Sequence, residues 1–128
     1  MGDVVSMRDK LRAATVGAAK NFKSEVVEYA GHKFIVRQPS VAQRGEILKR
    51  SKISTGDVEK MDPGELQVWA TVHCVYTEEG ERVFEEADAE SLRNEPSGGF
   101  VDAFSEVAIR LMNMGEQTAK NSAKTRKG

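Results

Sequence analysis

Residues 62–76 read DPGELQVWATVHCVY, and this stretch decides the fold because it holds the only Trp and the only Cys of the 128-residue chain. Asp62 can accept hydrogen bonds from the first backbone N–H groups of a helix, Pro63 suits the first helical position, and Glu65 stands where a capping-box carboxylate reaches back. Apolar residues then follow on most sides of such a helix, so it must be covered from several directions. The stretch therefore predicts a buried central helix.

The same letters also fit a β-strand. VWATVHCVY is rich in β-branched and aromatic residues, and its residues can be read with a period of two. The helix is preferred on the strength of its start signal, and the strand stays open as the alternative.

Before this stretch the hydrophobic period changes twice. Residues 1–23 predict a weakly ordered helix with a thin apolar stripe, and residues 24–38 alternate with a period of two around a glycine, which is typical of a β-hairpin. Pro39 ends the second strand because it has no N–H to donate. Ser40 is placed to cap a helix over residues 41–52.

The remaining elements are short except for the last helix. In chain order we expect a loop at 54–57 and then a tight turn at Glu79–Gly80 that packs Phe84 against the core. A short helix at 89–93, capped by Asp88, should follow. We expect a final helix at 100–114 that ends at Gly115, and a disordered basic tail at 116–128. The predicted fold class is α+β, mostly α, with one β-hairpin followed by a small helical bundle in a single globular domain over 24–115. The expected core residues are Trp69, Val72, Phe84, Phe100, Phe104 and Leu111.

Composition narrows the class of protein. A chain of 128 residues fits one domain with one real core, and the net charge of −1 argues against a surface built wholly for nucleic acid or anionic membrane. The charge is uneven, because residues 78–95 carry eight acids against two arginines, whereas residues 116–128 carry four basic residues against one acid. No apolar run is long enough for a signal sequence or a membrane span, and Cys74 alone cannot form an internal disulfide, so we expect a cytoplasmic protein.

No arrangement of residues predicts catalysis. His32 is interpreted as a solvated turn residue, His73 as a half-buried side chain with an ordinary hydrogen bond, and Cys74 as a small buried thiol. The acids around Gly80 lack the register of a calcium loop, and no phosphate-binding loop, zinc motif or nucleophile elbow is found. The sequence therefore predicts a protein that is not an enzyme and has no metal or cofactor.

The order of the segments resembles a known family. A hairpin ending in VRQPSVAQRGEI is followed by LQVWATVHCVYTEEGERVF, then EEADAESLRNEP, then FVDAFSEVAIRLMN. Over residues 24–115 this order is similar to that of the tail assembly chaperones of long-tailed bacteriophages, with the likeness carried by 77–84, 86–92 and 111–113. The resemblance implies a non-catalytic protein in the cytoplasm of a bacterial host. It would bind the tape measure protein while the tail tube assembles, and the tail tube protein is a second expected partner.

The partner-binding surface is expected from residue type alone. Methionines at the end of the last helix can form a plastic apolar surface, and the basic tail can meet charged partners. These expected partner-binding residues are Met112, Met114, Lys120, Lys124, Arg126 and Lys127. Two other functions stay open: a head-tail joining or tail-completion protein that forms a ring, and a small nucleic-acid-binding protein, although neither a membrane nor a specific nucleic acid is an expected partner.

Overall fold

The computed structural model describes residues 6–16, 18–55 and 58–112 of the chain. Its helices are α1 (Met7–Ala14), α2 (Val41–Arg50), α3 (Pro63–Cys74), α4 (Ala89–Arg93) and α5 (Phe100–Leu111), with a 3₁₀ turn η1 (Glu86–Asp88) before α4. Its strands are β1 (Ser24–Tyr29), β2 (His32–Arg37), β3 (Lys52–Thr55), β4 (Val58–Met61) and β5 (Val75–Thr77). The fold class is therefore α+β, mostly α, as the sequence predicts.

Helix α3 is the centre of the body, and it begins as predicted. The Asp62 carboxylate accepts hydrogen bonds from the backbone N–H groups of Gly64 and Glu65, at 2.9 and 3.2 Å. The expected capping box does not form. The Glu65 carboxylate instead accepts from Trp69 Nε1 at 3.3 Å and from the Arg93 guanidinium, because α4 packs beside the start of α3 and offers a stronger, charged donor.

The end of α3 differs from the prediction of a helix through residue 76. The helix stops at Cys74, and Val75 to Thr77 form β5, which pairs antiparallel with β2. The described sheet has the strand order β1-β2-β5, so β5 pairs with the edge of β2 that faces away from β1. This pairing satisfies the backbone N–H and C=O groups of a segment that is rich in β-branched and aromatic residues. Both interpretations of the sequence therefore apply, each to a different part of the stretch.

The predicted first hairpin is confirmed. Strands β1 and β2 pair antiparallel from Ser24 opposite Arg37 to Tyr29 opposite His32. Ala30 and Gly31 connect them with φ angles of 54° and 81°, the left-handed conformation that a tight two-residue hairpin turn requires.

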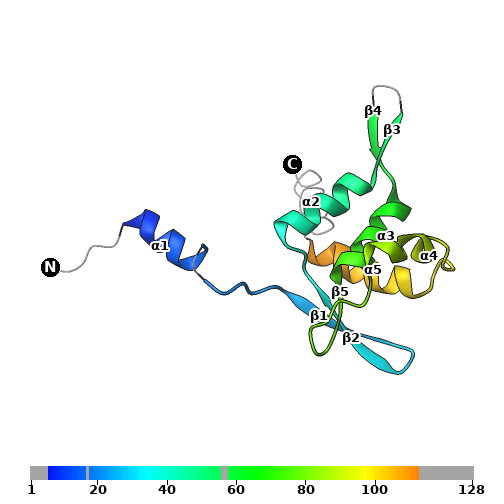
Figure 1. The fold of residues 1–128 in the computed structure, drawn as a ribbon, viewed down its shortest axis with the longest axis horizontal. Helices are drawn as coiled ribbons and strands as arrows, with labels where there is room; N and C mark the ends of the chain where they lie inside the picture. The colour runs from blue at the N-terminus through cyan, green and yellow to red at the C-terminus, as the bar shows by residue number, and fades with distance from the viewer. Residues whose placement is uncertain (1–5, 17, 56–57, 113–128) are drawn as a thin grey trace, which may run out of the picture.

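A second hairpin, β3 with β4, was missed. The loop expected at 54–57 is instead a connection between two four-residue strands that pair from Lys52 opposite Met61 to Thr55 opposite Val58. The hairpin projects from the body beyond α2 and α3 (Figure 1). Its signal was present in the β-branched residues Ile53, Thr55 and Val58 around a Gly-Asp pair, but the polar composition suggested a loop.

Other boundaries shift by a few residues. Helix α2 ends at Arg50 rather than Lys52, and its Ser40 cap is confirmed, since Ser40 and Gln43 form a capping box. The short helix at 89–93 is confirmed, but Asp88 does not cap it with its side chain, which accepts from the backbone N–H of Glu85 at 2.8 Å.

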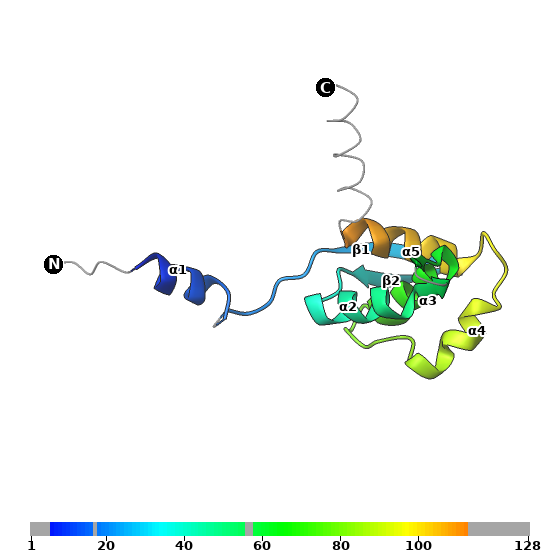
Figure 2. The same cartoon turned by 90° about the horizontal axis from the view of Figure 1, so that it is seen from above.

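The core lies between α3, α5 and the three-stranded sheet. Helix α5 packs against α3 and runs along β1 and β2 (Figure 2). Among the expected core residues, Trp69, Val72, Phe104 and Leu111 are buried. Phe84 and Phe100 are half-buried and pack against this core, and the turn with Gly80 at φ 92° brings Phe84 back to it as predicted. None of the helices in the described ranges is long and apolar enough to cross a membrane.

Helix α1 is set apart from this body by an extended segment (Figures 1 and 2). None of its residues is buried. Ser6 caps it by accepting from the backbone N–H of Asp9 at 3.1 Å. We call residues 6–23 the arm, and residues 24–112 the body.

Candidate functional site

The two side chains of α3 with reactive groups, Cys74 and His73, are both buried. Cys74 is fully buried, and burial raises the pKa of its thiol to about 12, so it stays protonated and is a poor nucleophile. His73 is 8% exposed, and neither ring nitrogen has a hydrogen-bond partner among the described residues. The hydrogen bond expected for His73 is thus wrong: its neighbour on the preceding helical turn is the Trp69 ring, 6.4 Å away between centroids, which offers no acceptor or donor to the imidazole nitrogens.

Burial also sets the charge state of His73. It lowers the pKa of the imidazole, and the nearby positive charge of Arg82 lowers it further, so the ring is held neutral. Neutral imidazole is a ligand and a base in many proteins, but no group of three or more His, Cys, Asp or Glu side chains that could hold a metal ion is found in the described part of the chain.

The acidic residues near α3 are used for ion pairs within the fold. Arg50 donates to Glu46 at 2.7 Å and to Glu86 at 2.6 Å, and its guanidinium lies 4.5 Å from the centroid of the Trp69 ring. The hydrogen bond from Arg93 is the main cause that lowers the pKa of Glu65. These carboxylates orient neighbouring elements rather than forming a pair suited to acid-base chemistry.

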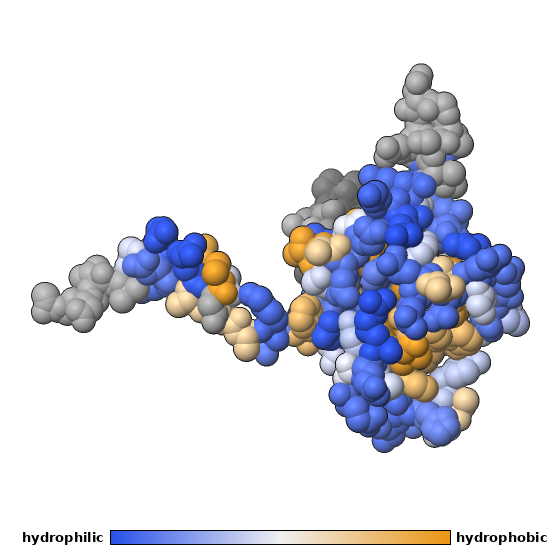
Figure 3. Space-filling model, viewed as in Figure 1, coloured by the Kyte–Doolittle hydropathy of each residue, from blue (hydrophilic) through white to orange (hydrophobic). Residues whose placement is uncertain are grey.

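An apolar pocket in the body opens to solvent, and we call it the aromatic pocket. Five of its seven lining residues are aromatic, and they come from both strands of the first hairpin, from the segment after β5 and from α5. The lining residues are Tyr29, Phe34, Val75, Val83, Phe84, Phe100 and Phe104. Figure 3 shows hydrophobic colour gathered on this face, between the hairpin and the helices.

The rings of the aromatic pocket hold one another. Phe100 lies stacked on Phe84 at 5.9 Å between centroids and edge-on to Tyr29 at 5.7 Å, and Phe34 is edge-on to Phe104 at 5.7 Å. Such pairs favour fixed ring orientations beyond the effect of burial alone. The pocket is therefore preformed by rigid side chains.

Two regular patterns place these rings. Phe100 and Phe104 are one helical turn apart on α5, so both face the hairpin. On the hairpin, Tyr29 and Phe34 reach the same face because Phe34 pairs with Val27, which stands two residues before Tyr29 on the same strand.

The size of the aromatic pocket limits what it can bind. Its volume is about 190 Å³, whereas pockets for small-molecule ligands are typically about 300 to 1,000 Å³. It suits one or two large apolar side chains. An apolar anchor on a partner helix is the ligand that fits this chemistry.

Charged residues lie beside the pocket. Glu85 follows Phe84, and a neighbouring hollow shares Phe84 and is lined also by Arg82, Glu85, Glu86 and Ala87. Arg50 pairs with Glu86 at 2.6 Å, so two arginines accompany the two acids and this border is mixed in charge.

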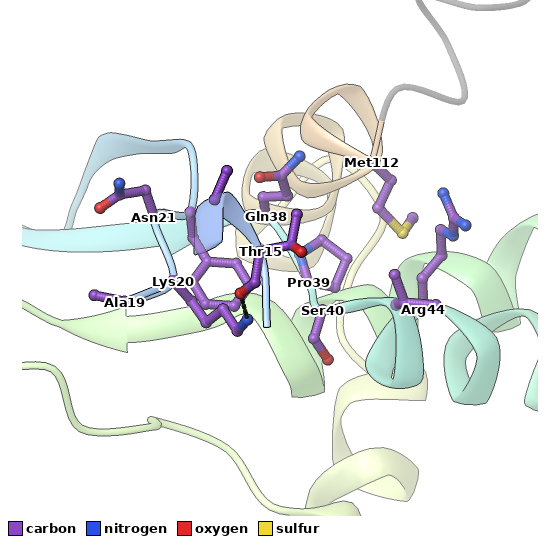
Figure 4. Close-up of a pocket in the computed structure, with 12 residues that line it drawn as sticks. Thr15, Ala19, Lys20, Asn21, Gln38, Pro39, Ser40, Arg44 and Met112 are labelled. Carbon is purple, nitrogen blue, oxygen red and sulfur yellow. Dashed lines mark hydrogen bonds between the residues drawn. The ribbon is translucent and has the colours of Figure 1, made fainter. Parts of the chain in front are cut away.

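A larger hollow of about 680 Å³ lies between the arm and α2 (Figure 4). Residues of the arm form one wall, where Lys20 donates to the carbonyl oxygen of Thr15 at 2.7 Å, and Pro39, Arg44 and Met112 lie on the other side. This hollow depends on where an exposed arm lies, and its lining is partly polar. The aromatic pocket, built wholly by the body, is the stronger candidate for a binding site.

The structure treats the expected partner-binding residues differently. Met112 is 3% exposed and packs in the core, so it offers little of the exposed surface that the sequence suggested, although it lines the hollow beside the arm. It is buried because the end of α5 packs against the rest of the body, where Gln38 Nε2 donates to the carbonyl oxygen of Leu111 at 3.4 Å. Met114, Lys120, Lys124, Arg126 and Lys127 lie outside the described residues, and a binding role for them stays a prediction.

Tyr29, Phe34 and Val83 were not expected at a binding site. Four of the five Phe residues and one of the two Tyr residues line the pocket, yet they are spread over 76 positions of sequence from 29 to 104. Alternation along the hairpin showed that some of these residues share a face. The alternation did not show that this face of the hairpin is open to solvent near Tyr29, which is 41% exposed, and covered by the core at Val36, which is fully buried.

Comparison with known proteins gives a similarity of fold. No protein-family model and no curated protein sequence matches the chain. The fold is similar to a solved structure titled "Structure of bacteriophage HK97 tail assembly chaperone", with a TM-score of 0.51 and 17% sequence identity over 84% of this chain and all of that one.

Proposed function

We propose that this chain is a phage tail assembly chaperone that binds a tape measure protein without catalysis, using the aromatic pocket to hold apolar side chains of a helical segment. The observation that carries the proposal is the open pocket of five aromatic rings in a fold similar to that of a tail assembly chaperone. The buried thiol of Cys74, whose raised pKa makes it a poor nucleophile, agrees with a binding role.

A chaperone must shield an apolar helix and later release it. A small pocket gives contacts with a few anchor residues rather than a large dry interface, which suits moderate affinity. The acidic segment 78–95, with eight acids against two arginines, adds electrostatic attraction to a basic partner, which speeds the encounter more than it strengthens the complex. Binding should therefore weaken, without disappearing, as salt is raised.

Co-expression with the tape measure protein encoded nearby tests the proposal. The wild-type chain should keep more of that protein soluble and should be recovered with it in a pull-down. Tyr29→Lys places a charge at the 41%-exposed edge of the pocket and should abolish both effects.

Val26→Lys is the matched control. It lies on the same strand and is 59% exposed, but three residues from Tyr29 it faces the other side of the sheet. It should behave like the wild type. If the tape measure protein stays insoluble with the wild-type chain and no complex is recovered at any salt concentration, the chaperone function is wrong, and a regular ring seen by microscopy would then favour a tail-completion protein.

A further inference from the structure

The side chains that line the aromatic pocket carry one polar group in all. Of the seven lining residues, six are Phe or Val, and the seventh is Tyr29, which stands at the 41%-exposed edge. A ligand that enters the pocket therefore gains by covering apolar surface. A hydroxyl, amide or indole N–H buried with it would lose its hydrogen bonds to water and find few replacements.

The volume of the pocket corresponds to one ring. It measures about 190 Å³, and an apolar cavity of about 150 Å³ lined by Leu, Ile and Phe is known to take up benzene. A single six-membered ring thus fills most of the space. The size selects one large side chain, and the chemistry of the walls then decides which side chain binds best.

The rings around this space present both faces and edges to a ligand. Phe34 and Phe100 are inclined at 86° and 66° to Phe104, with centroids 5.7 and 6.1 Å away. Aromatic rings have negative faces and positive edges, so pairs of rings prefer edge-to-face or offset-stacked contacts with centroids about 4.5 to 7 Å apart. A ring that enters the pocket can make such contacts with several walls at once, whereas an aliphatic side chain has no matching charge distribution.

The common apolar side chains differ in how they would fit these walls. Leu covers a similar apolar area but lacks the contacts between rings. Met makes favourable contacts between its sulfur and aromatic rings, but it has three rotatable bonds to fix. Tyr and Trp carry an O–H or N–H that usually needs a partner when buried. Phe combines a rigid ring with no polar group.

We propose that the aromatic pocket is a binding site for one aromatic ring without a polar group, so that the anchor it takes is a Phe side chain in preference to Leu, Met, Tyr or Trp. That this Phe belongs to a tape measure protein rests on the proposed function, whereas the preference for a ring does not. Phe100 contributes most to the preference, because its centroid lies within 6.1 Å of three other ring centroids of the pocket.

A titration of the full chain with two small probes tests the proposal. The probes are N-acetylphenylalanine amide and N-acetylleucine amide, whose side chains gain similar free energy from burial. The phenylalanine probe should bind roughly two- to tenfold more tightly, which is the contribution of contacts between rings. Methyl NMR signals of Val75 and Val83, which line the pocket, should shift more with this probe than other methyl signals do.

Variants of the pocket locate the source of the preference. Phe100→Leu keeps an apolar wall but removes a ring, so the two probes should bind with nearly equal affinity. Phe84→Leu removes the ring stacked on Phe100 at 5.9 Å and should also reduce the preference. Val83→Phe places a ring of the chain itself in the pocket and should block both probes. Circular dichroism melts check that each variant is folded.

Phe22→Leu is the matched control. The Phe22 ring lies 4.4 Å from the Arg37 guanidinium and is not part of the pocket lining. This variant loses one ring, as Phe100→Leu does, but it should keep the full preference for the phenylalanine probe. A loss of preference as large as that in Phe100→Leu would place the ring-binding site elsewhere and overturn the proposal.

Two further results would overturn it. They are equal affinities of the wild-type chain for the two probes, and a preference that survives in the folded Phe100→Leu and Phe84→Leu variants. The titrations contain no tape measure protein, so they fail separately from the proposed function. A ring preference without rescue of the tape measure protein would leave the ring site standing and refute the chaperone function, and rescue without a ring preference would do the reverse.

Discussion

Helices α3 and α1 begin in the same way and end up in opposite surroundings. Asp62 caps α3 and Ser6 caps α1, each accepting from backbone N–H groups of the first turn. In α3, seven consecutive residues from Val68 to Cys74 are buried, whereas in α1 none is. A cap starts a helix, but only burial couples that helix to the stability of the whole protein.

The largest loss of stability is expected when large side chains in the core of the body are replaced by Ala. Trp69 is 6% exposed and Phe104 is 3% exposed, so Trp69→Ala and Phe104→Ala should each lower the free energy of unfolding by about 3 to 5 kcal/mol. Urea melts measure this loss. A loss below about 1 kcal/mol at either site would place that side chain outside the packed core and break the contrast with α1.

The helix caps sharpen the comparison, because the same hydrogen bond occurs in both regions. Ser40 of α2 and Ser6 of α1 each accept from the third backbone N–H of their helix at 3.1 Å. Ser40→Ala should lower the free energy of unfolding by about 1 kcal/mol, since α2 packs on the body through Ile47. Ser6→Ala should leave the melt of the monomeric chain unchanged, and equal losses at the two sites would show that the arm unfolds together with the body.

The two histidines give a third contrast, in pH dependence. Burial lowers the pKa of His73 in the folded state, so below about pH 6.5, the usual value, the unfolded chain binds a proton more readily than the folded one. Stability should fall as the pH drops from there and level off below the folded-state pKa. His73→Leu should remove this part of the slope in melts at several pH values, while His32→Leu, at an exposed strand end, should keep it.

The smallest effect is expected on the arm itself. Leu11 is 65% exposed, so Leu11→Ala should change the free energy of unfolding by less than about 0.5 kcal/mol when the chain is dilute enough to be monomeric. The measurement is a melt at low protein concentration. A clear loss there would mean that α1 packs on its own body.

Much of the body could be predicted because its signals are local. The Asp62-Pro63 start, the Ser40 cap, the glycine of the first hairpin and the Gly80 turn each act within a few residues, so the sequence shows them directly. The predictions failed where a distant element offered a better partner. Arg93 pairs with Glu65 in place of the capping box, and pairing with the edge of β2 makes the last two residues of the predicted central helix, Val75 and Tyr76, part of a strand.

By itself the sequence determined the fold class and the buried character of residues 68–74, because composition and period fix which faces must be hidden from water. The tertiary structure alone decided that five rings from separate segments meet around an open pocket, and that Met112 is buried while Leu11 is not. The register of β1 with β2 and the packing of α5 along them set these outcomes. Such contacts join residues far apart in the chain, and no local pattern in the sequence specifies which of them stays uncovered.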